Sequence, residues 1–413
     1  MSTEDYLHVH ESEFIIPHEI ASWRPPVGVL SEKGVELVSD VTNWFDKVPL
    51  MEIAREGIDL EADIPPGAVP PAGVSLWRAK DQEEEKYMKE IIIGKGLKEG
   101  HLRMARKEEV RMVNIFPTFL LFKRPGKYRD VINFKSVLDL SRWKRKNVSF
   151  NDATPLHRRP SVSPGRIREA FHILERMVKE GVDRNAIRVA KLDIAEAYKH
   201  IMISKSVQRQ QSFKVGGQVY ISLRMQFGTA ASASIWCRLM NMVEQTFHML
   251  GLGTITYFDD ILLISISAGR AVRGLRLVRS ILKCLGLKVN EEKSDAHGSR
   301  HCEFLGIEID LDTWSARVMS KSIDKIRKRC MDLRALCRRE RSSNEEEEEE
   351  GDEIEEREGE EAMAFLTDTV DEIGLQGSEC RGSVKVLAQK IAGGLNFSAG
   401  VIRCIKPVRS HFH

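Results

Sequence analysis

Two adjacent aspartates, Asp259 and Asp260, interrupt a hydrophobic pattern in the stretch TITYFDDILLIS, residues 254–265. The β-branched and aliphatic residues on both sides predict two strands that turn back at this point. Asp is a favoured turn residue, so the pair could serve only to solvate a hairpin. A third carboxylate, Asp193 in VAKLDIAEAY, ends another apolar run 66 residues before Asp259. If that strand and the hairpin share one sheet, the three acids converge at one edge.

Converging carboxylates repel one another unless cations neutralise them. Magnesium prefers a few carboxylates together with waters and substrate phosphates, which matches what these aspartates offer. Two such ions about 3.5 to 4 Å apart would stabilise the attacking and leaving oxygens of a phosphoryl transfer. The three acids therefore indicate phosphoryl-transfer chemistry with two magnesium ions, for which manganese is a substitute.

The rest of the chain alternates predicted strands and helices, which is typical of an α+β fold. FPTFLLFKRPGKYRDVINFK reads as a basic hairpin around RPGK, and QSFKVGGQVYISLRM as a second strand pair. A helix is predicted in SPGRIREAFHILERMVKEG, with Gly181 past its end, and others in KDQEEEKYMKEIIIGKGLKEG, in AEAYKHI, before Leu250, in AVRGLRLVRSILKCLG and from Lys321. Residues 1–80 mix Pro-rich pieces with short apolar patches and are expected to be an irregular lead-in.

The charge is unevenly distributed along the 413 residues, although the formal net charge is only +2. Residues 345–361 contain thirteen acids and one Arg, which leaves 62 basic against 48 acidic residues, or +14, elsewhere. A block of like charge cannot be buried, so residues 342–375 are expected to be a disordered acidic insertion. The basic remainder is typical of a protein that binds polyanions.

Seven cysteines occur without a CxxC pair, an arrangement that favours reduced thiols over a disulfide framework or a zinc site. The N-terminus lacks an apolar signal core, and no apolar run is long enough to span a membrane. We therefore expect a cytoplasmic or nuclear protein without a membrane partner. The pattern does not specify an oligomeric state.

Several ordered motifs between Lys80 and Val318 resemble those of reverse transcriptases from long-terminal-repeat retroelements, of the gypsy-like and DIRS-like groups. A weaker similarity covers residues 383–410. The resemblance implies a right-hand polymerase with fingers, palm and thumb, in which helices back an antiparallel palm sheet. It places fingers and palm at 81–320 and a helical thumb and connection at 321–341 and 376–413.

The same resemblance assigns roles to individual residues. Asp193, Asp259 and Asp260 would be the catalytic carboxylates and metal ligands, joined by the backbone carbonyl of Ile194. Tyr198 would lie under the incoming sugar, although it could instead be a core tyrosine. The remaining assignments are triphosphate binding for Lys123 and Arg129, nucleotide or template support for Phe227 and Gly228, protonation of pyrophosphate for Lys293, and the primer grip for Phe304, Leu305 and Gly306.

The sequence departs from the family pattern at a few positions. Met225 and Gln226 replace the usual Leu-Pro before Phe227, and Ala233 replaces a frequent Pro. No protease motif precedes the predicted palm, and the chain stops about where an RNase H domain would begin. We therefore interpret it as a stand-alone or truncated polymerase portion.

The resemblance implies an RNA-directed DNA polymerase that extends a primer on an RNA or DNA template with deoxynucleoside triphosphates. One alternative is a retroelement remnant that binds nucleic acid without catalysis. A second is an RNA-dependent RNA polymerase, which shares the aspartates but normally lacks an aromatic residue at the position of Tyr198.

Overall fold

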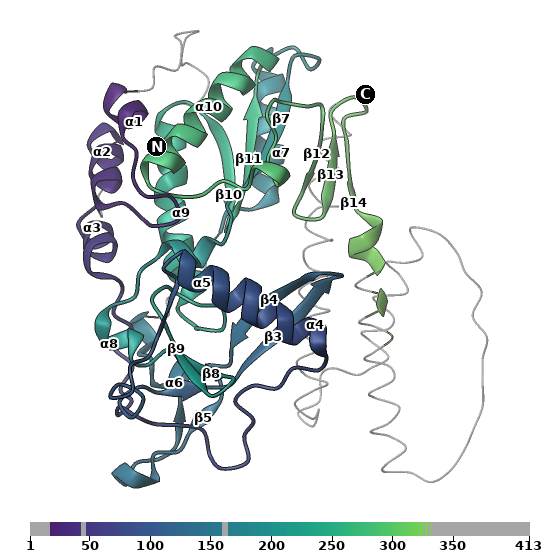
Figure 1. Ribbon diagram of the computed structural model, residues 1–413. Helices are drawn as coiled ribbons and strands as arrows, with labels where there is room; N and C mark the ends of the chain where they lie inside the picture. Colours follow the sequence, from purple (N-terminus) through teal and green to yellow (C-terminus); the bar gives the residue numbers. More distant parts are fainter. Residues whose placement is uncertain (1–16, 43–46, 159–163, 325–326, 329–330, 332–413) are drawn as a thin grey trace, which may run out of the picture. The chain divides into compact units, whose positions relative to one another are not determined.

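The computed structural model describes residues 17–42, 47–158, 164–324, 327–328 and 331 (Figure 1). The chain divides into two compact units, residues 1–304 with 310–313, and residues 305–309 with 314–413. The predicted acidic insertion lies wholly outside the described residues, and so does almost all of the predicted thumb and connection. The domain boundaries of the sequence analysis therefore stay predictions.

A three-stranded antiparallel sheet carries the region of the paired aspartates. Its strand order is β10 (Gly253–Tyr257), β11 (Asp260–Ser265) and β7 (Arg188–Asp193). Every residue of β11 after Asp260 is buried, which explains its uninterrupted apolar sequence. Helices α7 (Ile167–Lys179), α9 (Ser232–Met249) and α10 (Ala268–Cys284) pack against this sheet (Figure 1). The predicted α+β class with helices backing an antiparallel sheet is confirmed.

The predicted helix at residues 167–179 shows how the sequence directs its packing. Ile167, Ala170, Leu174 and Met177 recur at helical spacing and are all buried. Gly181 follows the helix end with a φ of 85°, a conformation that costs a glycine little. The predicted helix and its stop signal are both confirmed.

The predicted hairpins are confirmed as well. β3 (Thr118–Arg124) pairs with β4 (Lys127–Ile132) around the predicted RPGK turn. β8 (Ser212–Val215) pairs with β9 (Gln218–Ser222) around two glycines. These last two strands belong to a four-stranded sheet with the order β1 (Leu102–Met104), β9, β8 and β2 (Ile115–Phe116), and β5 (Val137–Leu138) pairs with β6 (Val148–Ser149).

The predicted helix around residues 82–98 forms, but its middle is a π-helix. α4 (Gln82–Lys86) continues into the π segment Tyr87–Gly94 and then into α5 (Lys95–Lys98). Met88 and Ile93 are the buried residues of the π segment. They are five positions apart, which matches the i to i+5 repeat of a π-helix better than the α-helical repeat.

The prediction of an irregular lead-in over residues 1–80 is wrong for part of that range. The structure contains α1 (His18–Ser22), α2 (Glu32–Thr42) and α3 (Lys47–Glu56), and α1 and α2 pack against α10. A Cβ atom on Gly34 would lie 2.0 Å from the carbonyl oxygen of Cys284, so α2 approaches the end of α10 closely. Short helices interrupted by prolines give a weak periodic signal, and burial against α10 supplies the stability.

The remaining elements are short. The predicted helix in AEAYKHI is only the 3-10 turn η5 (Ala197–His200), because Glu196 before it is left-handed and Ile201 after it is extended. The other elements are η3 (Ser141–Trp143), α6 (Phe150–Ala153), η4 (Leu156–Arg158), α8 (Lys205–Gln208), η6 (Glu291–Lys293), β12 (His301–Phe304), β13 (Ile307–Asp310) and β14 (Ser315–Val318). Residues 320–324 begin the helix predicted from Lys321. No helix within the described residues is long and apolar enough to cross a membrane.

Candidate active site

The three aspartates meet at one end of the β10-β11-β7 sheet. Asp260 begins β11 and pairs directly with Asp193, the last residue of β7. The backbone N–H of Ile194 donates to the carbonyl oxygen of Asp259 at 2.7 Å, which ties the end of β7 to the hairpin turn. The predicted convergence of Asp193, Asp259 and Asp260 is therefore confirmed. That the carbonyl of Ile194 faces a metal stays a prediction.

A buried tryptophan supports the turn between β10 and β11. Phe258 has a φ of 54°, a left-handed conformation that is uncommon for a residue with a side chain. Its carbonyl oxygen accepts a hydrogen bond at 3.0 Å from Nε1 of Trp236, which is fully buried on α9. The contact between helix and turn fixes the backbone immediately before Asp259.

Two lysines offset the charge of the carboxylates. Nζ of Lys293 lies 3.2 Å from Oδ2 of Asp193, and Nδ2 of Asn290 donates to Oδ1 of the same aspartate at 2.9 Å. Nζ of Lys191 lies 2.9 Å from Oδ1 of Asp260. Asp193 is buried, and a charge placed there needs a partner to offset its lost contact with water. Lys293 was predicted as a site residue, whereas Lys191 and Asn290 were not.

Within the aspartate cluster, the pKa of Asp259 is raised. Its side chain reaches solvent, yet neighbouring protein groups displace part of its water, and this desolvation raises its pKa. The charge of Asp260 raises the pKa further. Burial alone would lower the pKa of Lys191, but its ion pair with Asp260 and the charge of Asp193 raise it overall. Lys191 is therefore a firmly charged partner for Asp260.

The three aspartates offer the kind of oxygen donors that a divalent cation takes. Carboxylate oxygens are the ligands that magnesium prefers, and ammonium groups already lie beside two of the three carboxylates. These lysines occupy positions where positive charge is favourable. Asp193, Asp259 and Asp260 are thus suited to hold divalent cations once a lysine contact is exchanged for a metal contact.

An aromatic and cationic group lies next to the aspartates. The rings of Tyr198 and Phe227 are 4.8 Å apart between centroids and inclined by 51°. The guanidinium of Arg129 lies over the Phe227 ring, 4.6 Å from its centroid. Burial raises the pKa of Tyr198, and the charge of Asp259 adds to this effect, so the phenol is neutral and close to the acids. The structure brings these three predicted residues together.

Lys123 also faces this region from the end of β3. Loss of water contact lowers its pKa, followed by the positive charges of Arg129 and Lys293. The negative charge of Asp259 acts in the opposite direction. Lys123 is therefore close enough to interact electrostatically with Arg129, the other predicted triphosphate-binding residue, and with Asp259 of the aspartate cluster.

The local backbone conformation and the close approach of β4 both require a glycine at position 228. Its φ is 102°, and a Cβ atom there would lie 2.4 Å from the carbonyl oxygen of Ile132 on β4. The side chain of Asn151 donates to the Gly228 carbonyl at 2.9 Å and accepts from the N–H of Ala230 at 2.8 Å. We predicted a close approach of nucleotide or template at Gly228, and the close approach that the structure shows is to β4.

The predicted primer-grip residues occupy a turn. Phe304 ends β12 and its side chain is buried, so its ring belongs to the core. Leu305 and Gly306 follow with φ values of 52° and 79°. A role of this turn in holding a primer stays a prediction, and it would involve the backbone and Leu305 and not the ring of Phe304.

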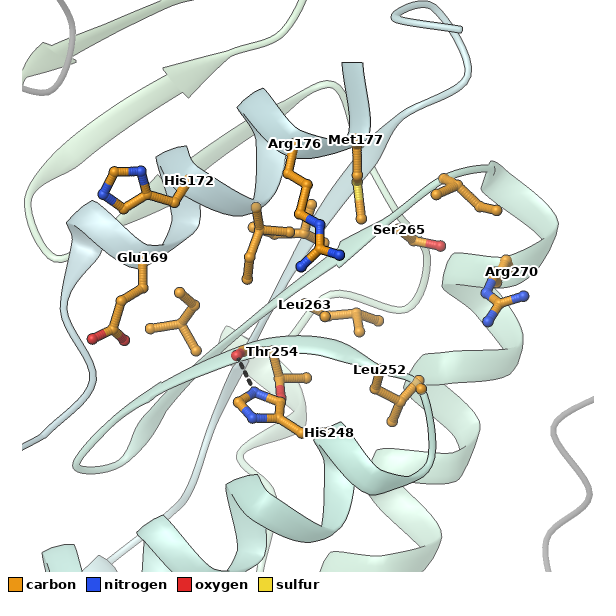
Figure 2. A pocket seen from close by; sticks show the side chains of 16 residues that line it. Glu169, His172, Arg176, Met177, His248, Leu252, Thr254, Leu263, Ser265 and Arg270 are labelled. Atoms are coloured by element: carbon orange, nitrogen blue, oxygen red, sulfur yellow. Dashed lines mark hydrogen bonds between the residues drawn. The ribbon is translucent and has the colours of Figure 1, made fainter. Parts of the chain in front are cut away.

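A separate cavity of about 480 Å³ lies beside β10. Figure 2 shows it between α7, the end of α9 and the strands β10 and β11, with His248 bonded to the Thr254 carbonyl at 2.8 Å. Apolar side chains such as Ile173, Leu252 and Leu263 line much of it. None of the predicted site residues lines this cavity.

One known protein family matches the part of the chain that carries the aspartates. Residues 154–309 match the family described as reverse transcriptase (RNA-dependent DNA polymerase). This range contains Asp193, Tyr198, Asp259, Asp260 and Lys293. It does not include Lys123 and Arg129, whose roles depend on the hairpin motif.

The similar proteins include transposon polyproteins and a foamy virus protease-reverse transcriptase. The Tf2-3 and Tf2-4 transposon polyproteins of Schizosaccharomyces pombe are each 23% identical over 239 residues, which cover 57% of this chain. The chain spans about 15% of the length of those relatives. Among solved structures, the native prototype foamy virus protease-reverse transcriptase is 21% identical, with 62% of this chain and 29% of that chain covered and a TM-score of 0.43. The foamy viral protease-reverse transcriptase solved with double-stranded DNA is 16% identical, with 92% and 63% covered and a TM-score of 0.47.

The matched range covers the sheet that carries the aspartates. The match spans the whole β10-β11-β7 sheet, and the paired aspartates lie where the motifs placed them. Residues 154–309 are thus similar to a reverse transcriptase domain, and the chain is similar to retrotransposon polyproteins, as its motifs indicated.

Proposed function

We propose that this chain is an RNA-directed DNA polymerase that transfers a nucleotide from a deoxynucleoside triphosphate to a primer 3′-hydroxyl. The observation that carries the proposal is the direct pairing of Asp260 with Asp193 beside the Asp259 turn. This places three carboxylates at one end of one sheet, two of them beside lysines, where oxygen donors for divalent cations would be needed. The reverse transcriptase match over residues 154–309 supports the same chemistry.

Asp193, Asp259 and Asp260 would hold two magnesium ions, or manganese in their place. When bound, such ions stabilise the negative charge on the attacking and leaving oxygens. The protein holds these carboxylates in position through the pairing of β7 with β11 and through the bond from Trp236 to Phe258. Positioning of this kind supplies much of the acceleration in phosphoryl transfer.

The surrounding residues would bind the nucleotide. Arg129 and Lys123 offer a guanidinium fork and a point charge, which suit the oxygens of a triphosphate. Arg129 is held over the Phe227 ring, so part of its ordering cost is already met before the nucleotide binds. The ring of Tyr198 would pack against the sugar, because it adjoins both Phe227 and the aspartates.

Lys293 would donate a proton to the leaving pyrophosphate. Its ammonium group is now bound to both carboxylate oxygens of Asp193, at 3.2 and 3.3 Å. Lys293 would exchange this contact with Asp193 for one with the leaving pyrophosphate when Asp193 serves as a metal ligand. The lysine would then move from neutralising the aspartate to neutralising the product.

The partner would be a primed RNA or DNA template. Outside the acidic run the chain has a formal charge of +14, which favours a polyanion. The foamy viral protease-reverse transcriptase has been solved with an RNA/DNA hybrid and with double-stranded DNA, and we extend that class of partner to this chain as part of the proposal.

Primer extension on an RNA template with magnesium and deoxynucleotides tests the proposal. Asp193→Asn, Asp259→Asn and Asp260→Asn each remove a metal charge and keep the side-chain shape, so extension should fall by about 100-fold or more. Glu292→Gln removes an exposed charge outside the cluster and should leave extension unchanged. Template binding by gel shift should persist in all four variants.

Two outcomes would contradict the proposal. Template binding without extension by the unaltered chain would favour the silent nucleic-acid-binding remnant. Efficient extension with ribonucleotides in preference to deoxynucleotides would favour an RNA polymerase.

A further inference from the structure

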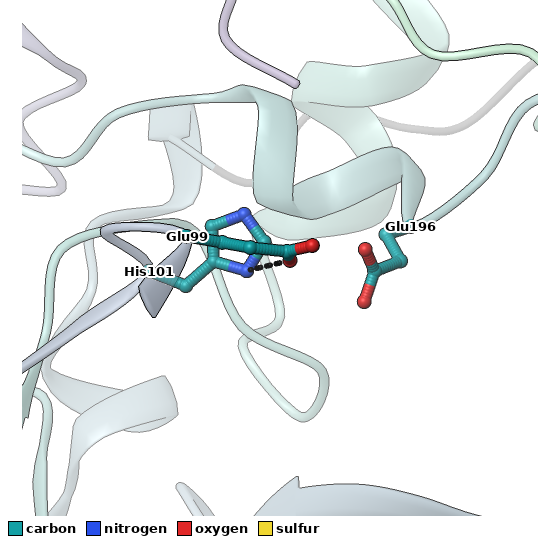
Figure 3. Close-up of side chains that lie close together, drawn as sticks. All are labelled: Glu99, His101 and Glu196. Atoms are coloured by element: carbon teal, nitrogen blue, oxygen red, sulfur yellow. Dashed lines mark ion pairs between the residues drawn. The ribbon is translucent and has the colours of Figure 1, made fainter. Parts of the chain in front are cut away.

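We propose that Glu99, His101 and Glu196 form a second cation site, which binds a divalent transition metal such as zinc. Each residue offers one ligand atom, and these atoms all lie within 4.8 Å of one another. Figure 3 shows the two carboxylates and the imidazole turned toward a common point. None of the three belongs to the aspartate cluster, so this site is independent of the proposed polymerase function.

Two segments that are distant in sequence bring these ligands together. Glu99 follows α5, and Gly100, with a φ of 68°, turns the chain so that His101 precedes β1. Glu196 comes from the turn between β7 and η5, where its backbone is left-handed with φ 51° and ψ 40°. The site would therefore join the α5-β1 junction to the loop that follows Asp193.

The state of His101 is the observation that points to a ligand. The residue is only 7% exposed, and its ring makes no hydrogen bond within the described part of the chain. Nδ1 lies 3.6 Å from a carboxylate oxygen of Glu99, which is too long for a hydrogen bond. Within the described residues, the ring's contact with the cluster is this long ion pair, which a bound metal would replace with a direct bond.

A cation already bridges the two glutamates. Nζ of Lys95 lies 3.1 Å from Oε2 of Glu196 and 3.7 Å from Oε2 of Glu99. The side chain of Lys95 is 43% exposed, and a lysine stem is flexible, so the ammonium group can move into solvent. A metal ion would take the place of this ammonium group and gain the nitrogen of His101 as a third ligand.

The ligand types select the class of metal. An imidazole nitrogen with carboxylate oxygens suits zinc better than magnesium, which prefers oxygen ligands and its own waters. Three protein ligands leave a fourth position open. A cavity of about 200 Å³ adjoins the site and is lined by all three ligands together with Lys199 and His200. It offers room for a water molecule or a small anion at that position.

Cobalt is a useful probe, because its visible absorption reports the ligand type. The full chain should carry Asp193→Asn and Asp259→Asn, so that the aspartate cluster no longer binds metal. We expect one equivalent of cobalt to bind without a thiolate charge-transfer band, and zinc to displace it. Glu196→Gln and His101→Ala should each weaken binding by about tenfold or more, because they remove a ligand.

The Lys95→Met variant distinguishes a metal site from a plain ion-pair network. If Lys95 competes with the metal, its removal should tighten cobalt binding, by about tenfold. His301→Ala, in the exposed group of His301, Asp310 and Asp312, is the matched control and should leave binding unchanged. Circular dichroism should show that each variant is folded.

Several results would overturn the proposal. The proposal fails if cobalt does not bind even to the Lys95→Met chain, or if binding survives Glu196→Gln. It also fails if a thiolate band appears, or if the His301→Ala control loses binding. Because every measurement is made in a chain without a working aspartate cluster, failure here leaves the polymerase proposal intact.

Discussion

Glu244 on α9 should make the stability of the protein depend on pH. Its carboxylate oxygen Oε1 accepts a hydrogen bond at 2.7 Å from the backbone N–H of Thr256, three residues before Asp259. Burial raises the pKa of Glu244 to about 8; the hydrogen bond opposes this shift and the charge of Glu169 adds to it. Near pH 7 the folded protein therefore holds this carboxyl group mostly in its neutral form.

The sign of the effect follows from the raised pKa. Below about pH 4.5 the carboxyl is protonated in both the folded and the unfolded chain, so it contributes nothing. Between about pH 4.5 and 8 the unfolded chain releases the proton and the folded chain keeps it, so the free energy of unfolding falls as pH rises. Above that range both states are ionised and the penalty stays constant. At about 1.36 kcal/mol per pKa unit, the full penalty reaches a few kcal/mol, at most about 5.

Glu244→Gln removes the titration and keeps the acceptor for Thr256. The free energy of unfolding, measured by urea unfolding with circular dichroism, should be nearly the same for the variant and wild type at low pH. Toward about pH 9 the glutamine variant should become progressively more stable than wild type. The exposed Glu292→Gln variant is the control, and its difference from wild type should not change with pH. A constant difference between Glu244→Gln and wild type, or a wild type that is relatively more stable at high pH, would refute the reasoning.

Two further predictions concern nucleotide choice and template binding. Tyr198→Ala should raise ribonucleotide incorporation in a primer-extension assay by at least about tenfold, because the ring packed on Phe227 would no longer exclude the 2′-hydroxyl. Tyr198→Phe should behave as wild type. Equal discrimination against ribonucleotides by all three chains would make Tyr198 only a core residue. Deletion of residues 345–361, which lie outside the described residues, should tighten template binding at about 50 mM salt, because the acidic run would compete with nucleic acid for the basic surface. The difference in affinity should shrink as salt is added. Equal affinities of the two chains throughout a salt titration would show that the acidic run does not compete.

The position of the aspartates was predictable because local patterns and chemistry agree. Asp193 and the Asp259 pair each come at the end of an apolar run, and a strand with both faces buried needs such a run. The repulsion between converging acids then predicted positive charge among them, and the structure provides Lys293 and Lys191. The pairing of β7 with β11 satisfies both conditions, so the sequence sufficed for this part of the fold.

The partners of these aspartates were not predictable in the same way. Asn290, whose amide reaches Asp193, is 97 residues from it, and Trp236 is 22 residues from Phe258. Only the tertiary fold brings such pairs together, and neither residue belongs to a pattern with a fixed spacing. Lys191 did leave a signal, since it is a charged residue in a strand that is otherwise largely apolar. Such a residue needs a buried partner, and Asp260 is the one that the structure provides.

The charges explain how the aspartate cluster is stable before it binds metal. Lys293 neutralises Asp193, and Lys191 neutralises Asp260, so Asp259 is the carboxylate without an ion pair among the described residues. It is also the carboxylate whose pKa is raised by desolvation and by Asp260. The remaining negative charge therefore gathers on the most exposed of the three aspartates, at the hairpin turn. Asp259 is therefore the carboxylate of the three that would most readily offer its oxygens to a divalent cation, while Lys293 and Lys191 stay beside their partners.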